Sequence, residues 1–279
     1  MIDTHIHADT RSSEDFEIMY NNGIETAITC SYYPYTPNNN PDILINHFER
    51  IINFETERVN EYNINLEVAL GLHPVNIIDN DEKIYEYLRK RIEEEKIIAI
   101  GEIGLEKDSE KERETFKKQL QIAEETQTKV IVHTPRKNKK EVLEGIKEVI
   151  FENINPKLVV IDHINYDTIE DVIDTEFTIG LTVQPHKLSP NDAIAILDEY
   201  GFDRFLLNSD MSNKPSNILS IPNTIKKLKN RNYSQKNIDK IAFNNAKNFF
   251  NIWKTIESSI IKKLLLILQY ILKKVRIII

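Results

Sequence analysis

The sequence predicts a (β/α)8 barrel, a fold in which eight parallel strands alternate with helices. Eight short and mostly apolar segments are each followed by a helical segment, a pattern typical of a parallel sheet whose outer face is covered by helices. These units fill most of the 279 residues, as expected for a closed barrel of about 250 residues. An open doubly wound sheet is the alternative, but no glycine-rich dinucleotide fingerprint follows the first strand.

Each predicted element follows from a local pattern. Strands are expected at residues 1–9, 24–30, 65–70, 97–102, 129–133, 158–163, 177–183 and 204–210, where the apolar runs lie. Helices are expected at residues 12–22, 42–61, 81–95, 109–126, 137–151, 168–173 and 191–200. Ser12 or Ser13 opens the first helix and Gly23 ends it. A loop rich in proline, tyrosine and asparagine, residues 32–41, precedes the second helix.

The composition suits one large domain, because 41% of the residues are hydrophobic and 29% are charged. The formal net charge of −8 gives no general affinity for nucleic acid, so such a substrate would need a local basic patch or bound metal. Cys30 is the only cysteine, which excludes an intrachain disulfide and a thiolate-rich metal site. The N-terminus has no pattern of a signal peptide, so we expect a cytoplasmic protein.

Two histidines near the N-terminus, His5 and His7, form the first half of a candidate metal site. Side chains alternate between the two faces of a strand, so both imidazoles should project from one face. Ile2, Thr4 and Ile6 should then project from the other face. Imidazole is the commonest protein ligand for zinc and similar ions, and both rings could reach one cation without distorting the backbone.

More polar side chains stand where the other predicted strands end. They are His73 after the third strand, Glu102 after the fourth, His133 after the fifth, His163 after the sixth and Asp210 after the eighth. In a barrel these ends converge on the face where active sites lie. So many ligands exceed the needs of one tetrahedral ion and indicate two divalent metals with a bridging carboxylate. Without thiolates, Zn²⁺, Mn²⁺ and Mg²⁺ all fit, and we expect no organic cofactor.

A two-metal site also indicates the reaction class. Paired ions lower the pKa of a water between them and hold an ester, amide or phosphate oxygen for attack, so the predicted reaction is hydrolysis. The substrate could be a phosphodiester, or a small amide, lactone or other ester. A barrel that binds metal without catalysis is a third possibility, but the presence of both Glu102 and Asp210 argues against it.

The same residues lie in six motifs that resemble the TatD family of metal-dependent hydrolases, within the amidohydrolase-like barrels. The motifs are His5-Ile6-His7, Gly71-Leu72-His73-Pro74, Gly101-Glu102-Ile103-Gly104-Leu105, Val130-Ile131-Val132-His133, Asp162-His163 and Ser209-Asp210, in this order. Residues 215–253 fit as closing helices of the barrel. The resemblance implies a phosphodiesterase, and specifically a deoxyribonuclease, with DNA or another phosphodiester as substrate.

The resemblance also implies a role for each matched residue. His5, His7 and Asp210 would bind one metal, His133 and His163 would bind the other, and Glu102 would bridge both. Asp210 would also orient or deprotonate the attacking water, so Asp210 and Glu102 are the expected catalytic residues. His73 would contact the substrate phosphate.

The chain departs from the family pattern at three positions. Asn208 stands where an acidic residue is common, and Glu106 stands where an aspartate is usual. Arg136 follows His133 by three residues, where the family often has an arginine after two. We expect Arg136 to bind a substrate phosphate, helped by the lysines at 137–140. An amide or lactone hydrolase would instead have an uncharged pocket and no use for Arg136.

The composition changes in the C-terminal tail, residues 254–279. From Ile260 onward a helix would carry isoleucine and leucine on one face and lysine, glutamine and arginine on the other. The apolar run is too short to span a bilayer. We expect this tail to pack against the barrel or to mediate self-association, and contact with a membrane surface is the alternative.

Overall fold

Eight parallel strands form one sheet, in which each strand pairs with its neighbour in the sequence. The strands are β1 (Ile2–Ile6), β2 (Thr26–Cys30), β3 (Asn65–Leu70), β4 (Ala99–Gly104), β5 (Lys129–His133), β6 (Val159–Ile161), β7 (Thr178–Thr182) and β8 (Phe205–Asn208). The helices are α1 (Ser13–Asn21), α2 (Pro41–Arg50), α3 (Thr56–Asn60), α4 (Glu82–Glu93), α5 (Glu110–Thr126), α6 (Lys139–Asn153), α7 (Pro190–Tyr200), α8 (Ser220–Asn230), α9 (Gln235–Asp239) and α10 (Asn245–Phe250). This computed structural model describes residues 1–31 and 39–252.

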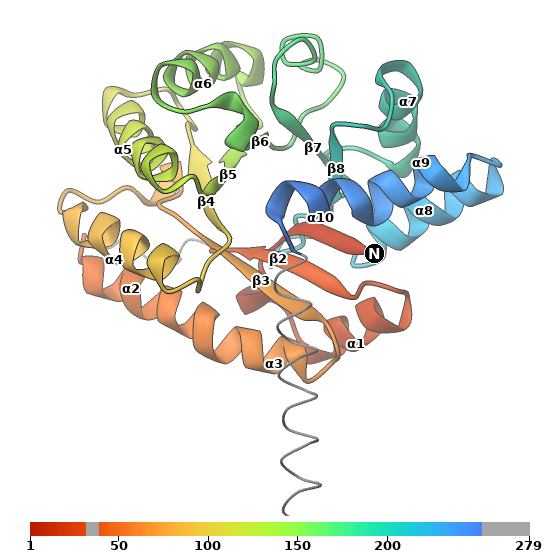
Figure 1. The fold of residues 1–279 in the computed structure, drawn as a ribbon, viewed down its shortest axis with the longest axis horizontal. Helices are drawn as coiled ribbons and strands as arrows, with labels where there is room; N and C mark the ends of the chain where they lie inside the picture. The colour runs from red at the N-terminus through yellow and green to blue at the C-terminus, as the bar shows by residue number, and fades with distance from the viewer. Residues whose placement is uncertain (32–38, 253–279) are drawn as a thin grey trace, which may run out of the picture.

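The sheet closes where β1 meets the end of β8. Thr4 Oγ1 donates a hydrogen bond to Leu207 O at 3.0 Å, and the backbone nitrogen of Asp210 donates to His5 O at 2.9 Å. The helices lie outside the ring of strands (Figure 1). The architecture is therefore the predicted (β/α)8 barrel.

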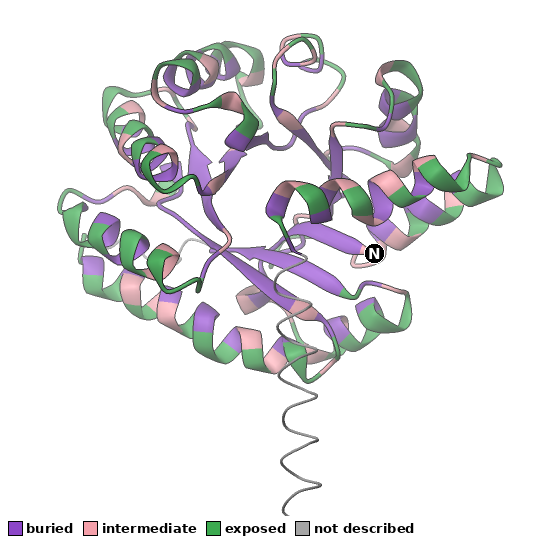
Figure 2. Cartoon of the chain, in the orientation of Figure 1, coloured by how far each residue is buried: buried purple, intermediate pink, exposed green. Residues whose placement is uncertain are grey.

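The strands are buried along almost their whole length, whereas each helix is buried on one side only (Figure 2). Phe16 of α1, Phe116 of α5 and Phe205 of β8 are among the largest fully buried side chains. Apolar surface removed from water stabilises a fold by about 25 cal/mol per Å². This explains why the strands are continuous apolar runs and the helices are amphipathic.

Serine residues fix the start of three barrel helices. Ser12, Ser109 and Ser189 precede α1, α5 and α7, and each forms a capping box with an acidic residue three positions later. The reciprocal hydrogen bonds satisfy backbone N–H groups that have no partner inside the helix. These three helices accordingly begin within one residue of the predicted positions.

The helix predicted at residues 168–173 is wrong. The chain between β6 and β7 forms a series of turns, with isolated hydrogen bonds such as Ile169 N to Asn165 O (2.9 Å) and Val172 N to Ile169 O (3.1 Å). Ile169 and Val172 are buried, which gave the segment a helical spacing of apolar residues. Four of its residues are β-branched, and such residues have low helix propensity.

The alternation predicted along β1 holds for its histidines but not for its isoleucines. The pairing of β1 with β2 shifts register between Asp3 and Ile6. As a result Ile2 packs in a small cluster with Leu206 and residues of α10, whereas Ile6 belongs to the main core with Phe16.

The division into a barrel at residues 1–253 and a tail at 254–279 stays a prediction, because the tail lies outside the described residues. The same holds for its predicted helix, self-association and membrane contact, and for the cytoplasmic location. Among the described helices, none has both the length and the hydropathy to cross a membrane.

Candidate metal centre

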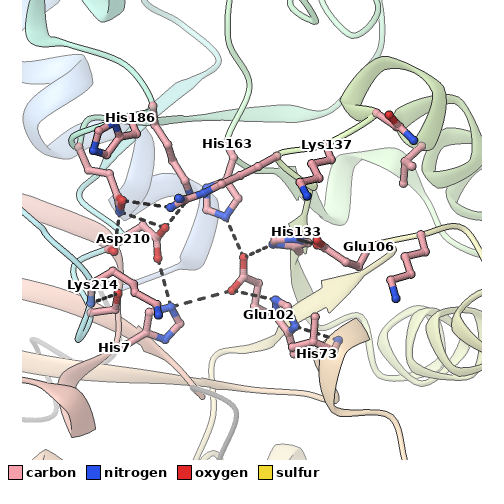
Figure 3. Close-up of a pocket in the computed structure, with 18 of the residues that line it drawn as sticks. His7, His73, Glu102, Glu106, His133, Lys137, His163, His186, Asp210 and Lys214 are labelled. Carbon is pink, nitrogen blue, oxygen red and sulfur yellow. Dashed lines mark hydrogen bonds and ion pairs between the residues drawn. The ribbon is translucent and has the colours of Figure 1, made fainter. Parts of the chain in front are cut away.

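The polar residues predicted at the strand ends meet at one end of the barrel (Figure 3). They are His5, His7, His73, Glu102, His133, His163 and Asp210, and they come from the ends of β1, β3, β4, β5, β6 and β8. A cavity of about 840 Å³ opens over them, and Arg136 lies in its wall. His5 is fully buried and does not reach the cavity wall.

Glu102 lies at the centre of this cluster, and its two oxygens contact different histidines. Oε1 lies 2.9 Å from His133 Nδ1 and 2.8 Å from His163 Nε2. Oε2 lies 3.5 Å from His5 Nε2 and 4.0 Å from His7 Nε2. A single carboxylate thus lies between two histidine pairs, which is the placement expected of a bridging ligand.

Asp210 completes the group around the first pair. Its Oδ1 lies 3.2 Å from His7 Nε2 and 4.0 Å from His5 Nε2. Ligand atoms that bind one cation at about 2.0–2.2 Å lie roughly 3–3.5 Å from one another. The nitrogen and oxygen atoms here have separations close to this range, so His5, His7 and Asp210 could hold one ion.

His5 provides a direct test of whether these residues fit a cation. Its Nδ1 hydrogen-bonds Asp162 Oδ2 at 2.7 Å, while Nε2 is buried and finds no hydrogen-bond partner in the part of the chain that the structure describes. Burial opposes a charge on the ring, but nearby groups, including Glu102 and Asp162, outweigh it and raise the pKa of His5 well above its ordinary value. The surroundings of Nε2 therefore favour a positive charge, and a metal ion would supply one.

Two other imidazoles are held in the same way through the nitrogen that points away from the centre. His7 Nδ1 lies 3.0 Å from the Cys30 carbonyl oxygen, and His163 Nδ1 lies 2.7 Å from Thr182 Oγ1. Histidines that bind metals usually donate their second N–H to such a partner, which fixes the tautomer and the ring orientation. These contacts leave Nε2 of each ring directed at a carboxylate.

Both central carboxylates are ionised. Burial favours the neutral acid, but His5 and His133 outweigh it and hold the pKa of Glu102 well below its ordinary range. For Asp210 the opposing groups are Lys187 and His7, which likewise lower its pKa. Ionised carboxylates and imidazole nitrogens form a donor set for a divalent cation without thiolates.

Comparison with known proteins identifies the family. A family model described as TatD related DNase matches residues 2–251. The chain belongs to the TatD family of metal-dependent hydrolases. The uncharacterized metal-dependent hydrolase MJ0761 of Methanocaldococcus jannaschii is 38% identical over 254 residues, which cover 90% of this chain and 100% of that protein. The uncharacterized metal-dependent hydrolase YabD of Bacillus subtilis is 24% identical and covers 70% of this chain and 81% of its own length.

Solved structures agree with this assignment. A TatD-like protein from Archaeoglobus fulgidus superposes with a TM-score of 0.77 at 28% identity and covers 90% of this chain and 100% of its own. The phosphotriesterase homology protein of Escherichia coli superposes with a TM-score of 0.67 at 15% identity and covers 89% of this chain and 98% of its own. This second likeness shows the fold alone.

His73 of this TatD protein has the properties of a hydrogen-bond donor. Burial and the neighbouring His133 lower the pKa of His73 to about 3, so its ring is neutral. Nδ1 accepts a hydrogen bond from Val75 N at 3.2 Å, which places the proton on Nε2, 3.7 Å from Glu102 Oε2. His73 also lies close enough to Glu102 and His133 to join them in a metal group, but its protonated Nε2 is better suited to the predicted substrate contact.

Only some of the basic residues predicted beside Arg136 lie in the cavity wall. Arg136 and Lys137 line the cavity. Lys139 is instead turned inward, where its Nζ donates to Thr134 Oγ1 and His163 O at 2.7 Å each, and burial lowers its pKa to about 7. Lys140 lies 3.7 Å from Asp171 and is not part of the cavity wall.

Two residues that contact Asp210 were not predicted from the sequence. Lys187 Nζ lies 2.5 Å from Asp210 Oδ2, and Gln184 Nε2 donates to the same oxygen at 3.1 Å. Both residues lie in the loop after β7, which matches none of the six motifs, so nothing in the sequence pointed to them. Glu106 was noted only as a departure from the family pattern, yet its Oε2 lies 2.9 Å from His133 Nε2.

Proposed function

We propose that this TatD protein is a two-metal phosphodiesterase whose substrate is DNA or another phosphodiester. His5, His7 and Asp210 would hold one divalent ion, His133 and His163 would hold the other, and Glu102 would contact both. When bound, these ions would supply an activated water and positive charge for the phosphate oxygens.

The observation that carries the phosphodiester proposal is the charge of the cavity wall. Arg136, Lys137 and Lys214 line the cavity and have no ion-pair partner among the described residues. Of the acidic residues in the wall outside the centre, Glu106 contacts His133 and Asp108 pairs with Arg113, and Glu141 alone has no ion pair among the described residues. Unpaired cations next to a metal centre attract anions into the cavity, and a phosphodiester is such an anion.

The residues of the centre have distinct parts in this reaction. Asp210 is ionised, so it can accept a proton from the attacking water, while Lys187 and Gln184 hold its Oδ2. His73 would donate a hydrogen bond from Nε2 to a phosphate oxygen. Arg136, next to Gln184, would bind a phosphate oxygen with its planar guanidinium group.

The test is hydrolysis by metal-stripped protein that has been reloaded with Mg²⁺, Mn²⁺ or Zn²⁺. The substrates are short single-stranded DNA and bis(p-nitrophenyl) phosphate, and Asp210→Asn is the control. We expect metal-dependent cleavage that Asp210→Asn abolishes. If the protein binds metal but cleaves neither substrate, the phosphodiesterase assignment is wrong, and amides and lactones become the candidates.

A matched pair of variants tests the role of the cavity wall. Arg136→Gln should raise the KM for DNA about tenfold, because it removes a charged hydrogen-bond donor. Lys107→Gln alters a cation elsewhere in the same cavity and should change KM less. An equal effect of both substitutions would contradict a specific role for Arg136.

A further inference from the structure

Asn208, the last residue of β8, lies beside the candidate metal centre but does not line its cavity. It is 1% exposed, and its Nδ2 donates a hydrogen bond to Asp162 Oδ1 at 2.8 Å. Asp162 is equally buried and follows directly after β6. The hydrogen bond therefore joins two strand ends behind the histidines.

The Asp162 carboxylate receives hydrogen bonds from several directions. Oδ2 lies 2.7 Å from His5 Nδ1. Oδ1 accepts from Asn208 Nδ2 and from the backbone nitrogen of His163, both at 2.8 Å. Because Asp162 is the hydrogen-bond partner that orients the His5 ring, any rotation of this carboxylate would also turn His5.

Gly180 of β7 confines the same carboxylate from another side. A Cβ atom at this position would lie 2.1 Å from Asp162 Oδ1, far inside van der Waals contact. The glycine therefore leaves the space that the carboxylate occupies. Together Gly180 and Asn208 define the position of Oδ1.

Only one of the two polar side-chain atoms of Asn208 has a hydrogen-bond partner among the described residues. Its Oδ1 is buried and has no hydrogen-bond partner among the described residues, and such a group costs about 1–3 kcal/mol. An apolar side chain of similar size would avoid this cost. What the amide provides in return is the hydrogen bond to Asp162.

We propose that Asn208 is a positioning residue: through Asp162 it directs His5 Nε2 toward the metal held by His5, His7 and Asp210. This inference rests on the proposed metal-binding function. Asn208 acts on this group through the contact between Asp162 and the His5 ring, whereas Asp162 meets His163 through a backbone hydrogen bond. Thr182 serves the other group, since its Oγ1 lies 2.7 Å from His163 Nδ1 and farther, 3.4 Å, from Asp162 Oδ1.

The experiment is a zinc titration of the metal-stripped full-length chain, with the two stepwise binding constants resolved by a competing chelator. Asn208→Leu removes the donor without adding charge, and Thr182→Val is the matched substitution at equal burial. We expect Asn208→Leu to weaken one constant by roughly 10–100-fold and Thr182→Val to weaken the other. The double variant should weaken both constants, because independent sites act additively.

Results that contradict the role of Asn208 differ from results that contradict the proposed metal-dependent function. Retention of both constants within about twofold in Asn208→Leu would overturn the proposal, and so would an equal loss at both sites. If Asn208→Leu does not fold, Gly180→Ala replaces it, because the added methyl group displaces Asp162 from the other side. Gly180→Ala should weaken the zinc-binding constant that Thr182→Val leaves unchanged. Failure of the unsubstituted chain to bind any of Zn²⁺, Mn²⁺ and Mg²⁺ would instead refute the proposed metal-dependent function.

Discussion

Lys187 Nζ lies 2.5 Å from one oxygen of Asp210, while the other oxygen of that carboxylate lies 3.2 Å from His7 Nε2. The two oxygens therefore have separate environments. Oδ1 points at the histidines that could hold a metal, and Oδ2 is held by a cation at the edge of the cavity. A single carboxylate thus contacts a candidate metal group through one oxygen and a lysine through the other.

Lys187→Met should accordingly impair catalysis without releasing metal. We expect the kcat for a phosphodiester to fall about tenfold, since the cation that holds Oδ2 of the proposed proton acceptor is lost. Zinc content should stay the same, because Oδ1 keeps its contacts. Steady-state kinetics and metal analysis of the same preparation check this, and Lys187→Arg, which keeps the charge, should have a smaller effect. Loss of zinc in Lys187→Met would contradict the separation of roles.

Glu102→Gln should affect both metal groups at once. Its two oxygens contact different histidine pairs, so loss of the negative charge weakens the binding of each ion. We expect both zinc affinities and the activity to fall about a hundredfold or more. Asp210→Asn should weaken only one ion, because Asp210 Oδ1 contacts His5 and His7 alone among the histidines. Similar zinc stoichiometry in the two variants would argue against a bridging role for Glu102.

The barrel could be predicted from the sequence because each strand and helix is indicated by residues that are neighbours in the chain. A run such as residues 130–132 is apolar and is followed by a histidine, and the structure has a strand over Lys129–His133. Closure of the barrel then brings such ends together regardless of their distance in the chain. For this reason all seven predicted strand-end residues, and Arg136 in the cavity wall, were found without knowledge of any contact.

Residues that act through long-range contacts could not be predicted from the sequence. Lys187 and Gln184 stand in a loop without a motif, and only the arrangement of β7 beside β8 places them on Asp210. The partner of Asn208 could not be predicted either, since Asp162 is 46 residues away and joins it only through the folded barrel. Local spacing also misled at residues 168–173, where buried apolar residues belong to turns.

Removal of metal should lower the stability of the protein as well as its activity. Ligands that bind only the folded state stabilise it by about 2.7 kcal/mol when present at a hundred times their Kd. For a domain of this size the melting temperature should rise by roughly 5–10 °C when zinc is added to the stripped protein. Differential scanning calorimetry measures the shift, and the Glu102→Gln variant should lack most of it. An unchanged melting temperature in the unsubstituted chain would speak against binding at this centre.

Ser109→Ala tests a contribution to stability away from the centre. Ser109 Oγ accepts a hydrogen bond from Glu112 N, and Glu112 Oε2 accepts from Ser109 N at 3.1 Å, at the start of α5. Loss of such a cap costs about 1 kcal/mol, or about 2–4 °C in melting temperature. Ser109→Thr keeps the acceptor and should melt near the unsubstituted protein. Zinc affinity should be the same in both, and a change in it would link α5 to the centre.

Truncation after Glu257 tests whether the barrel is complete without the tail. The family match ends at residue 251, and Phe250 and Ile252 are already buried in a cluster with Ile2 and Leu206. We therefore expect the shortened chain to keep its zinc affinity and melting temperature. Truncation after residue 244 is the contrasting variant, because it removes α10 and exposes the part of this cluster that lies on the barrel. It should destabilise the fold by several kcal/mol, as loss of large core side chains does. Loss of metal from the chain that ends at Glu257 would show that the tail belongs to the barrel.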